Sequence, residues 1–162
     1  MINFDQFKTL VCSGNWAGVY AMLDGARSRA VTDDDVSDEV YWRAVALTRQ
    51  RRYEEALQHL RANANLFNSQ CLAQKELASI LVKLGRNEEA LEELSKAPIE
   101  EEMKPFRALA LDAKFLYFYL LAKKGNQSIK ARLSEIPDDY RHFTLDRKFL
   151  TKPDIVALLE HA

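Results

Sequence analysis

Apolar residues recur at helical spacing along most of the chain, and one pattern of apolar and charged positions returns after 34 residues. The segment RYEEAL at 52–57 is matched by RNEEAL at 86–91, and outside these segments Leu47 corresponds to Leu81. A fixed period of this length is typical of an array of helix-turn-helix units. Because one unit cannot bury its apolar face alone, successive units are expected to stack against one another.

Apolar spacing, together with the positions of glycine and proline, divides the rest of the chain into further helices. Two segments, Thr32 with Asp35 and Thr151 with Asp154, have the spacing of a capping box at a helix start, and Ser69 can serve as an N-cap. No stretch reads as a strand, and residues 140–150 show no clean period, so the sequence predicts an all-α protein. The predicted helices are 3–13, one that starts at Trp16, 36–50, 53–66, 70–84, 87–97, one from Pro105 to Lys124, a short one that ends near Ile136, and a last one after Thr151.

The repeated pattern resembles the tetratricopeptide repeat family, whose units carry a Gly-x-Tyr turn followed by a small alanine. The segment 84–91 carries the glycine and the segment 53–57 carries the tyrosine, and each has the alanine, at Ala90 and Ala56. The resemblance implies a right-handed superhelical array of antiparallel helix pairs. We expect a single domain of three to four units with a C-terminal capping helix, at approximately 3–30, 36–67, 70–98, 103–136 and, for the cap, 140–162.

In that family the first helix of each pair lines a concave groove that binds a peptide. By resemblance, the groove residues of this chain fall on one stripe of its first helices. Arg49, Lys83 and Lys123 would form a basic row that can hold a carboxylate or an acidic peptide through charge-assisted hydrogen bonds; the alternative is that they are ordinary solvated charges. The asparagines of the family's carboxylate clamp are replaced by Val45 and Ser79, so that mode is not predicted. The expected partner-binding residues are Lys8, Tyr41, Val45, Thr48, Arg49, Lys75, Ser79, Val82, Lys83, Tyr119 and Lys123, and Phe4 and Cys12 continue the stripe.

A second candidate surface is the segment Phe115–Ala122, where apolar and aromatic residues cover every side of the helix. A helix that is hydrophobic all round has to be buried all round. Either the C-terminal helices wrap this segment, or its aromatic side chains bind a partner helix or a second copy of the chain, which would give a homo-oligomer.

The charge of the chain limits which classes of partner we expect it to bind. The chain of 162 residues has a net charge of −1, so it has no overall field that favours nucleic acid or a membrane surface. Charge is nevertheless uneven: residues 88–102 hold seven Glu and one Lys, whereas 123–152 hold eight Lys or Arg and four acids. Solvated faces explain this asymmetry, with a head-to-tail contact between copies as the alternative.

No membrane or secretory segment is expected. The longest uncharged apolar run, 115–122, has eight residues, against roughly 20 needed to cross a bilayer, and the N-terminus does not have the pattern of a signal peptide. The two cysteines are far apart and fit a reducing compartment. We therefore expect a soluble, cytoplasmic protein that binds neither membrane nor nucleic acid.

Signals of catalysis, metal binding or cofactor binding are lacking. The histidines at 59, 142 and 161 do not stand at metal-ligand spacing, and neither Cys12 nor Cys71 has the surroundings of a catalytic thiolate. The paired glutamates at 54–55 and 88–89 recur with the repeat near helix starts, where the helix dipole favours them. The sequence predicts no enzyme and no cofactor.

The expected function is therefore protein–protein interaction, with a peptide or helix of a partner held in the groove. One form is a chaperone or adaptor for a cognate, secreted protein. The alternatives are an immunity-type inhibitor that occludes a toxin or enzyme, and a self-assembling scaffold.

Overall fold

The computed structural model describes residues 2–161, most of which are helical. The first half contains α1 (Phe4–Cys12), α2 (Trp16–Ser28), α3 (Asp33–Arg49), α4 (Tyr53–Asn63) and a 3-10 turn at Ala64–Leu66. The second half contains α5 (Gln70–Lys83), α6 (Asn87–Ser95), α7 (Ile99–Glu102), α8 (Arg107–Lys123), the 3-10 helix η2 (Gln127–Glu135), β1 (Arg141–Phe143), β2 (Phe149–Thr151) and α9 (Lys152–Glu160).

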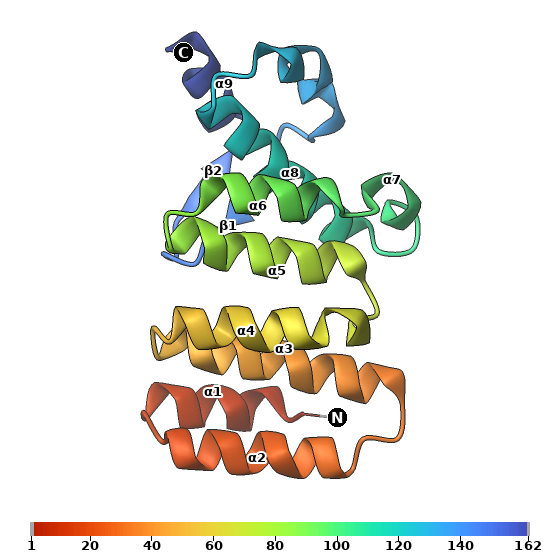
Figure 1. Ribbon diagram of the computed structural model, residues 1–162, viewed down its shortest axis with the longest axis vertical. Coiled ribbons are helices and arrows are strands. Elements are labelled where there is room, and N and C mark those ends of the chain that lie inside the picture. Colours follow the sequence, from red (N-terminus) through yellow and green to blue (C-terminus); the bar gives the residue numbers. More distant parts are fainter. Residues whose placement is uncertain (1, 162) are drawn as a thin grey trace.

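The helices are stacked along the long axis of the molecule, from α1 and α2 at one end to α9 at the other (Figure 1). Helix α2 packs against α3, α4 against α5, and both α5 and α6 against α8. The helices follow the predicted segments closely, although α8 begins two residues after Pro105, which therefore lies outside its first turn. The short helix α7 precedes it.

Four helices, α1, α3, α5 and α8, are followed by the same kind of turn, in which a backbone N–H bonds back to a carbonyl five residues earlier. These bonds join Asn15 to Leu10, Arg52 to Leu47, Arg86 to Leu81 and Asn126 to Leu121, at 2.8–3.0 Å. The residue before each donor has a left-handed backbone, which glycine adopts without steric cost. It is glycine in three of the turns, at 14, 85 and 125, and Arg51 in the turn after α3.

Small side chains allow the helix pairs to approach closely at repeat-equivalent positions. Ala56 on α4 and Ala90 on α6 are both fully buried, and Leu60 and Leu94 are 1% exposed. The largest apolar cluster lies between α3 and α8, and smaller clusters lie at the N-terminal end around Phe7 and at the C-terminal end. The core is therefore a continuous row of packed layers.

The predicted caps are confirmed. Thr32 and Asp35 exchange the hydrogen bonds of a capping box at the start of α3, and Thr151 and Asp154 do the same for α9. Ser69 accepts a hydrogen bond from the backbone N–H of Leu72 at the start of α5. The same helix end receives a second cap, because the buried carboxylate of Glu102 accepts hydrogen bonds from the Ser69 hydroxyl at 2.5 Å and from the Gln70 N–H at 2.7 Å.

The expectation that no stretch forms a strand is wrong for residues 141–151. β1 and β2 pair antiparallel, with His142 opposite Leu150, and the cap region consists of this hairpin followed by α9. Burial alternates along β1, where His142 is buried while its neighbours Arg141 and Phe143 are exposed. Three residues are too few for a period-2 pattern to stand out in the sequence.

The aromatic segment 115–122 lies inside the C-terminal cluster. Phe115, Phe118 and Ala122 are at most 1% exposed, and Tyr117, Tyr119 and Leu121 are partly buried. Helix α9 and η2 pack against α8, as expected if the C-terminal elements wrap it. The oppositely charged segments also meet within the chain, because Lys124 forms an ion pair with Glu88 at 2.5 Å.

Candidate functional site

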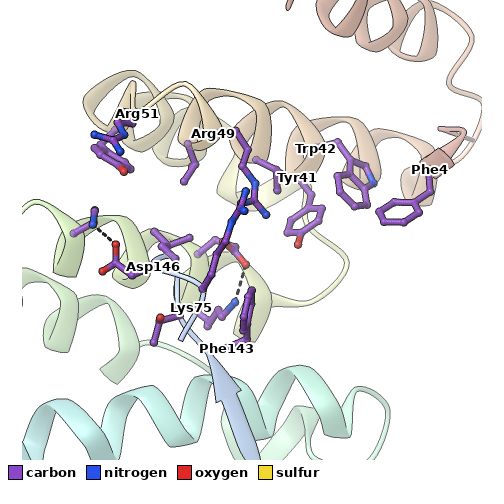
Figure 2. A pocket seen from close by; sticks show the side chains of 16 residues that line it. Phe4, Tyr41, Trp42, Arg49, Arg51, Lys75, Phe143 and Asp146 are labelled. Carbon is purple, nitrogen blue, oxygen red and sulfur yellow. Dashed lines mark hydrogen bonds and ion pairs between the residues drawn. The ribbon is translucent and has the colours of Figure 1, made fainter. Parts of the chain in front are cut away.

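A cavity of about 700 Å³ lies between α3, α5 and the tip of the β1–β2 hairpin (Figure 2). Tyr41, Arg49 and Arg51 reach into it from α3 and the turn after it, and Lys75 lies on the opposite side. The lining residues are Phe4, Tyr41, Trp42, Val45, Thr48, Arg49, Arg51, Tyr53, Lys75, Glu76, Lys83 and the hairpin residues 143–147.

A second cavity of about 360 Å³ lies between the hairpin, α5 and α8. The tip residues Thr144, Leu145 and Asp146 line both cavities, so the hairpin tip lies between them. Lys83, at the end of α5, also lines both, and it forms an ion pair with Asp146 of the tip. The carboxylate of Asp146 is therefore the internal partner of Lys83, one of the residues expected from the sequence to bind a partner protein.

The expected groove residues fall into three sets. The first cavity brings together Tyr41, Val45, Thr48, Arg49, Lys75 and Lys83, and of the remaining stripe also Phe4. The second cavity brings together Ser79, Val82, Lys83, Tyr119 and Lys123. Lys8 lines neither cavity and is exposed on α1, as is Cys12.

A partly buried polar cluster centred on Asp112 of α8 holds the hairpin in place. The Asp112 carboxylate accepts a hydrogen bond from the Tyr140 hydroxyl at 2.9 Å and lies 2.6 Å from Nδ1 of His142. Its other oxygen is 3.0 Å from the Lys75 ammonium, which also bonds Glu76 at 2.9 Å. One carboxylate therefore joins α5, α8, the residue before β1 and the middle of β1.

The charges of this cluster stabilise one another. Burial by itself would raise the pKa of Asp112, but the His142 hydrogen bond and the Lys75 charge outweigh it and hold the pKa well below its usual range. Burial likewise opposes the charged form of Lys75, yet Glu76 and Asp112 raise its pKa. Lys75 is thus engaged by two carboxylates inside the protein.

Aromatic stacking reinforces the same anchor. The His142 ring is stacked on Phe115 with a centroid distance of 5.3 Å and an interplanar angle of 13°, and the Tyr140 ring lies 5.5 Å from Phe115. His142 is only 2% exposed. These contacts show that His142 has a structural role, because they fix β1 on α8.

The first cavity is strongly basic, although the chain as a whole is almost neutral. Its lining holds five cationic and two acidic side chains, which leaves three positive charges in excess. Lys75 and Lys83 are paired with carboxylates, whereas Arg49, Arg51 and Arg147 form no ion pair within residues 2–161. Unpaired guanidinium groups in a hollow are suited to bind carboxylates from outside.

Exposed aromatic rings flank these charges. Phe4 is 54% exposed and Phe143 48% exposed, and both line the cavity. The Phe4 ring lies 5.4 Å from Trp42, which in turn lies 5.0 Å from Tyr41 (Figure 2). Burial of Tyr41 raises its pKa to about 12. Aromatic side chains next to cations are the usual composition of protein-binding hot spots.

Sequence reasoning missed the hairpin tip, Glu76, Arg51, Trp42 and Tyr53 as parts of the cavity. One of these residues could have been found from the 34-residue repeat, which aligns Arg51 with Gly85. The alignment indicates that an arginine stands at a turn position where the next repeat has glycine. The hairpin residues carry no comparable signal, since only the folded chain brings them beside α3.

Comparisons with family models, with curated proteins and with solved structures found no match to the chain. Between residues 2 and 161 no group of His, Cys, Asp and Glu is arranged to hold a metal ion. Over the same residues, no helix combines the length and apolar character needed to cross a membrane.

Proposed function

We propose that this chain is a tetratricopeptide-like binding module that holds an acidic segment of a partner protein in the cavity between α3, α5 and the hairpin tip. The observation that carries the proposal is the excess of unpaired arginines in a hollow flanked by exposed aromatic rings. A cavity of about 700 Å³ is within the usual size range of ligand sites. A chaperone or adaptor for a cognate protein is the form of this function that we favour.

The 34-residue repeat and the stacked helix pairs support the tetratricopeptide-like interpretation. In a right-handed array of this kind the first helices would line the concave side, and α3 and α5 both contribute to the cavity. The hairpin is an addition that narrows this side. No catalytic step is proposed, because every group close to the cavity is explained by binding or by anchoring of the hairpin.

Site-directed photo-cross-linking tests the proposal. Phe143→benzoylphenylalanine places the reactive group in the cavity with little change in shape, and the matched control is Phe106→benzoylphenylalanine, a 38% exposed site outside the cavity lining. In native lysate we expect a discrete cross-linked polypeptide from the first variant and not from the second. Equal products from both sites, or none from Phe143, would show that the cavity does not bind a protein.

A charge-reversed form checks that the capture depends on the basic row. Arg49→Glu with Lys83→Glu should abolish the cross-link from position 143, and the matched pair Lys104→Glu with Arg107→Glu, two exposed positions outside the cavity, should leave it unchanged. The identified partner then separates the classes: a chaperone client should aggregate when purified alone, whereas the target of an inhibitor should be a stable, active enzyme.

A further inference from the structure

Among residues 2–161, five have a left-handed backbone: three are glycines and two are arginines. Arg51 has φ of 60° and Arg147 has φ of 61°. A side chain at such a φ clashes with the following carbonyl, so residues other than glycine, asparagine and aspartate are rarely found there. Both arginines line the same cavity.

Arg51 lies in the turn after α3, where the three equivalent turns of the chain have glycine. The turn needs only a backbone, since its hydrogen bonds, Arg51 N–H to Thr48 O and Arg52 N–H to Leu47 O, involve no side chain. The Arg51 side chain is exposed and forms no ion pair within the described residues. Neither the turn nor an internal contact explains why an arginine stands here.

Arg147 occupies the corresponding position in the hairpin tip. Its N–H bonds the Thr144 carbonyl at 2.9 Å, and the Thr144 N–H bonds the Lys148 carbonyl at 2.9 Å, which closes the loop between β1 and β2. Short hairpin loops that contain a left-handed residue strongly favour glycine at that position. The Arg147 side chain, like that of Arg51, is exposed and without an ion pair in the described chain.

Both arginines line the same cavity as an ion pair of the chain itself, Lys83 with Asp146. Lys83 is paired with Asp146, whose hydrogen bond raises the pKa of Lys83, while the charge of Arg51 acts on the same pKa in the opposite direction. Arg51 is therefore within electrostatic reach of Lys83, and Arg147 follows Asp146 in the sequence. Arg49 extends this group of cations along α3 (Figure 2).

We infer that Arg49, Arg51 and Arg147 form a recognition site for the side-chain carboxylates of an acidic segment of the partner. The inference rests on the proposed function and specifies which chemistry the groove selects. Each guanidinium can bind a carboxylate through two parallel hydrogen bonds, which an ammonium cannot do. The unfavourable backbone at two of the three positions is then explained by the ligand, because strained residues persist where function requires them.

An acidic peptide fits this site better than a nucleic acid does. Glu76 and Asp146 stand in the same lining as the arginines and would repel a continuous phosphate backbone. The positive charge is also confined to one cavity of a chain with a net charge of −1, whereas nucleic-acid binding depends on an extended basic stripe. Discrete carboxylates can enter the spaces between these fixed charges.

Fluorescence anisotropy with defined probes tests the inference on the full chain. The main probe is fluorescein-labelled octaglutamate with an amidated C-terminus. Its controls are octaglutamine with an amidated C-terminus, octaglutamine with a free C-terminal carboxylate, and a single-stranded octathymidylate. We expect the octaglutamate alone to bind, and to bind more weakly as salt is raised. Equal binding of amidated octaglutamine, preference for the free C-terminus or tighter binding of the oligonucleotide would each overturn the inference.

Substitution by glycine separates the role of the side chain from that of the backbone. Arg51→Gly and Arg147→Gly remove the unfavourable backbone, so neither should lower the melting temperature. Each should weaken octaglutamate binding about 10-fold, as expected for the loss of one charge-assisted contact. Arg51→Lys should also bind more weakly, and Arg107→Gln, which removes one exposed positive charge outside the cavity, should bind as the wild type does.

The results also distinguish a failure of the inference from a failure of the proposed function. If the glycine variants bind octaglutamate normally, or melt at a lower temperature than the wild type, these arginines are not a carboxylate site. The cross-link from position 143 would then still report whether a protein enters the cavity. If that cross-link is absent while octaglutamate binding depends on Arg51, the site recognises carboxylates but the protein partner is wrong.

Discussion

Asp112→Asn should release the hairpin from the helices and destabilise the protein. Asparagine has the same shape as aspartate but no charge, so Lys75 loses one of its two carboxylates and His142 and Tyr140 lose a charged acceptor. A hydrogen bond to a charged group contributes ~1.5–3 kcal/mol, and removing one partner of a buried ion pair costs ~3–5 kcal/mol. Because the Asp112 side chain retains 25% of its exposure, we expect a loss of about 3 kcal/mol in the free energy of unfolding.

The pH dependence follows from the depressed pKa of Asp112 in the folded state. In the unfolded chain the pKa of Asp112 has its ordinary value of 3.8. The contribution of the carboxylate to the free energy of unfolding is therefore complete above about pH 5, and it is lost as the pH falls towards the lower pKa of the folded state. The difference in the free energy of unfolding between wild type and Asp112→Asn should therefore be largest near neutrality and should shrink below about pH 4.

Urea unfolding followed by circular dichroism, at neutral and at acidic pH, measures both effects. Tyr140→Phe is the matched control, since it removes only one of the hydrogen bonds that the Asp112 carboxylate accepts. It should lower the free energy of unfolding by only about 1 kcal/mol. An Asp112→Asn variant that unfolds at the wild-type urea concentration would show that this cluster does not stabilise the hairpin. A difference of the same size at neutral and acidic pH would show that the charge of Asp112 is not responsible.

Three further predictions concern the helices and the cysteines. Ala90→Leu should destabilise the protein by roughly 1–3 kcal/mol through overpacking between α5 and α6, and an unchanged melting curve would contradict the tight packing of this residue. Thr151→Ala should remove the capping box that it shares with Asp154 and cost about 1 kcal/mol in urea unfolding, and a cost near zero would show that α9 does not need this cap. In the native protein Cys12 should react readily with iodoacetamide, while Cys71, which is fully buried and has a pKa raised to about 12, should react only after unfolding; mass spectrometry of the labelled peptides reports the two sites separately.

The helical part of the fold was predictable because its signals are local and repeated. Pairs such as Leu47 and Leu81 recur at a fixed spacing, and the capping residues Thr32 and Thr151 mark helix starts by the chemistry of their side chains. Each of these features depends on neighbours within one or two turns, so a single sequence contains it. The stacking of the helices then follows from the apolar faces that they leave uncovered.

The hairpin was not predictable for the opposite reason. Its strands have three residues each, and β1 is held on α8 through the contact of His142 with Asp112, which lies 30 residues earlier in the chain. The sequence therefore identified Arg49 and Lys83 as neighbouring cations but not the carboxylate of Asp146 that approaches Lys83. Arg49 and Arg51 are neighbours in the sequence, but Arg147 joins them in the cavity lining only because the hairpin packs beside α3.

The late position of the hairpin has a consequence for the order of events during synthesis. Most contacts of the helical stack join neighbouring elements, and such contacts form early because little chain entropy is lost in closing short loops. The pairing of Lys83 with Asp146 spans 63 residues, so it cannot form until the hairpin itself has been synthesised. Until then Lys83 has no Asp146 to pair with, and the tip residues Thr144, Leu145 and Asp146 do not yet separate the two cavities that they line.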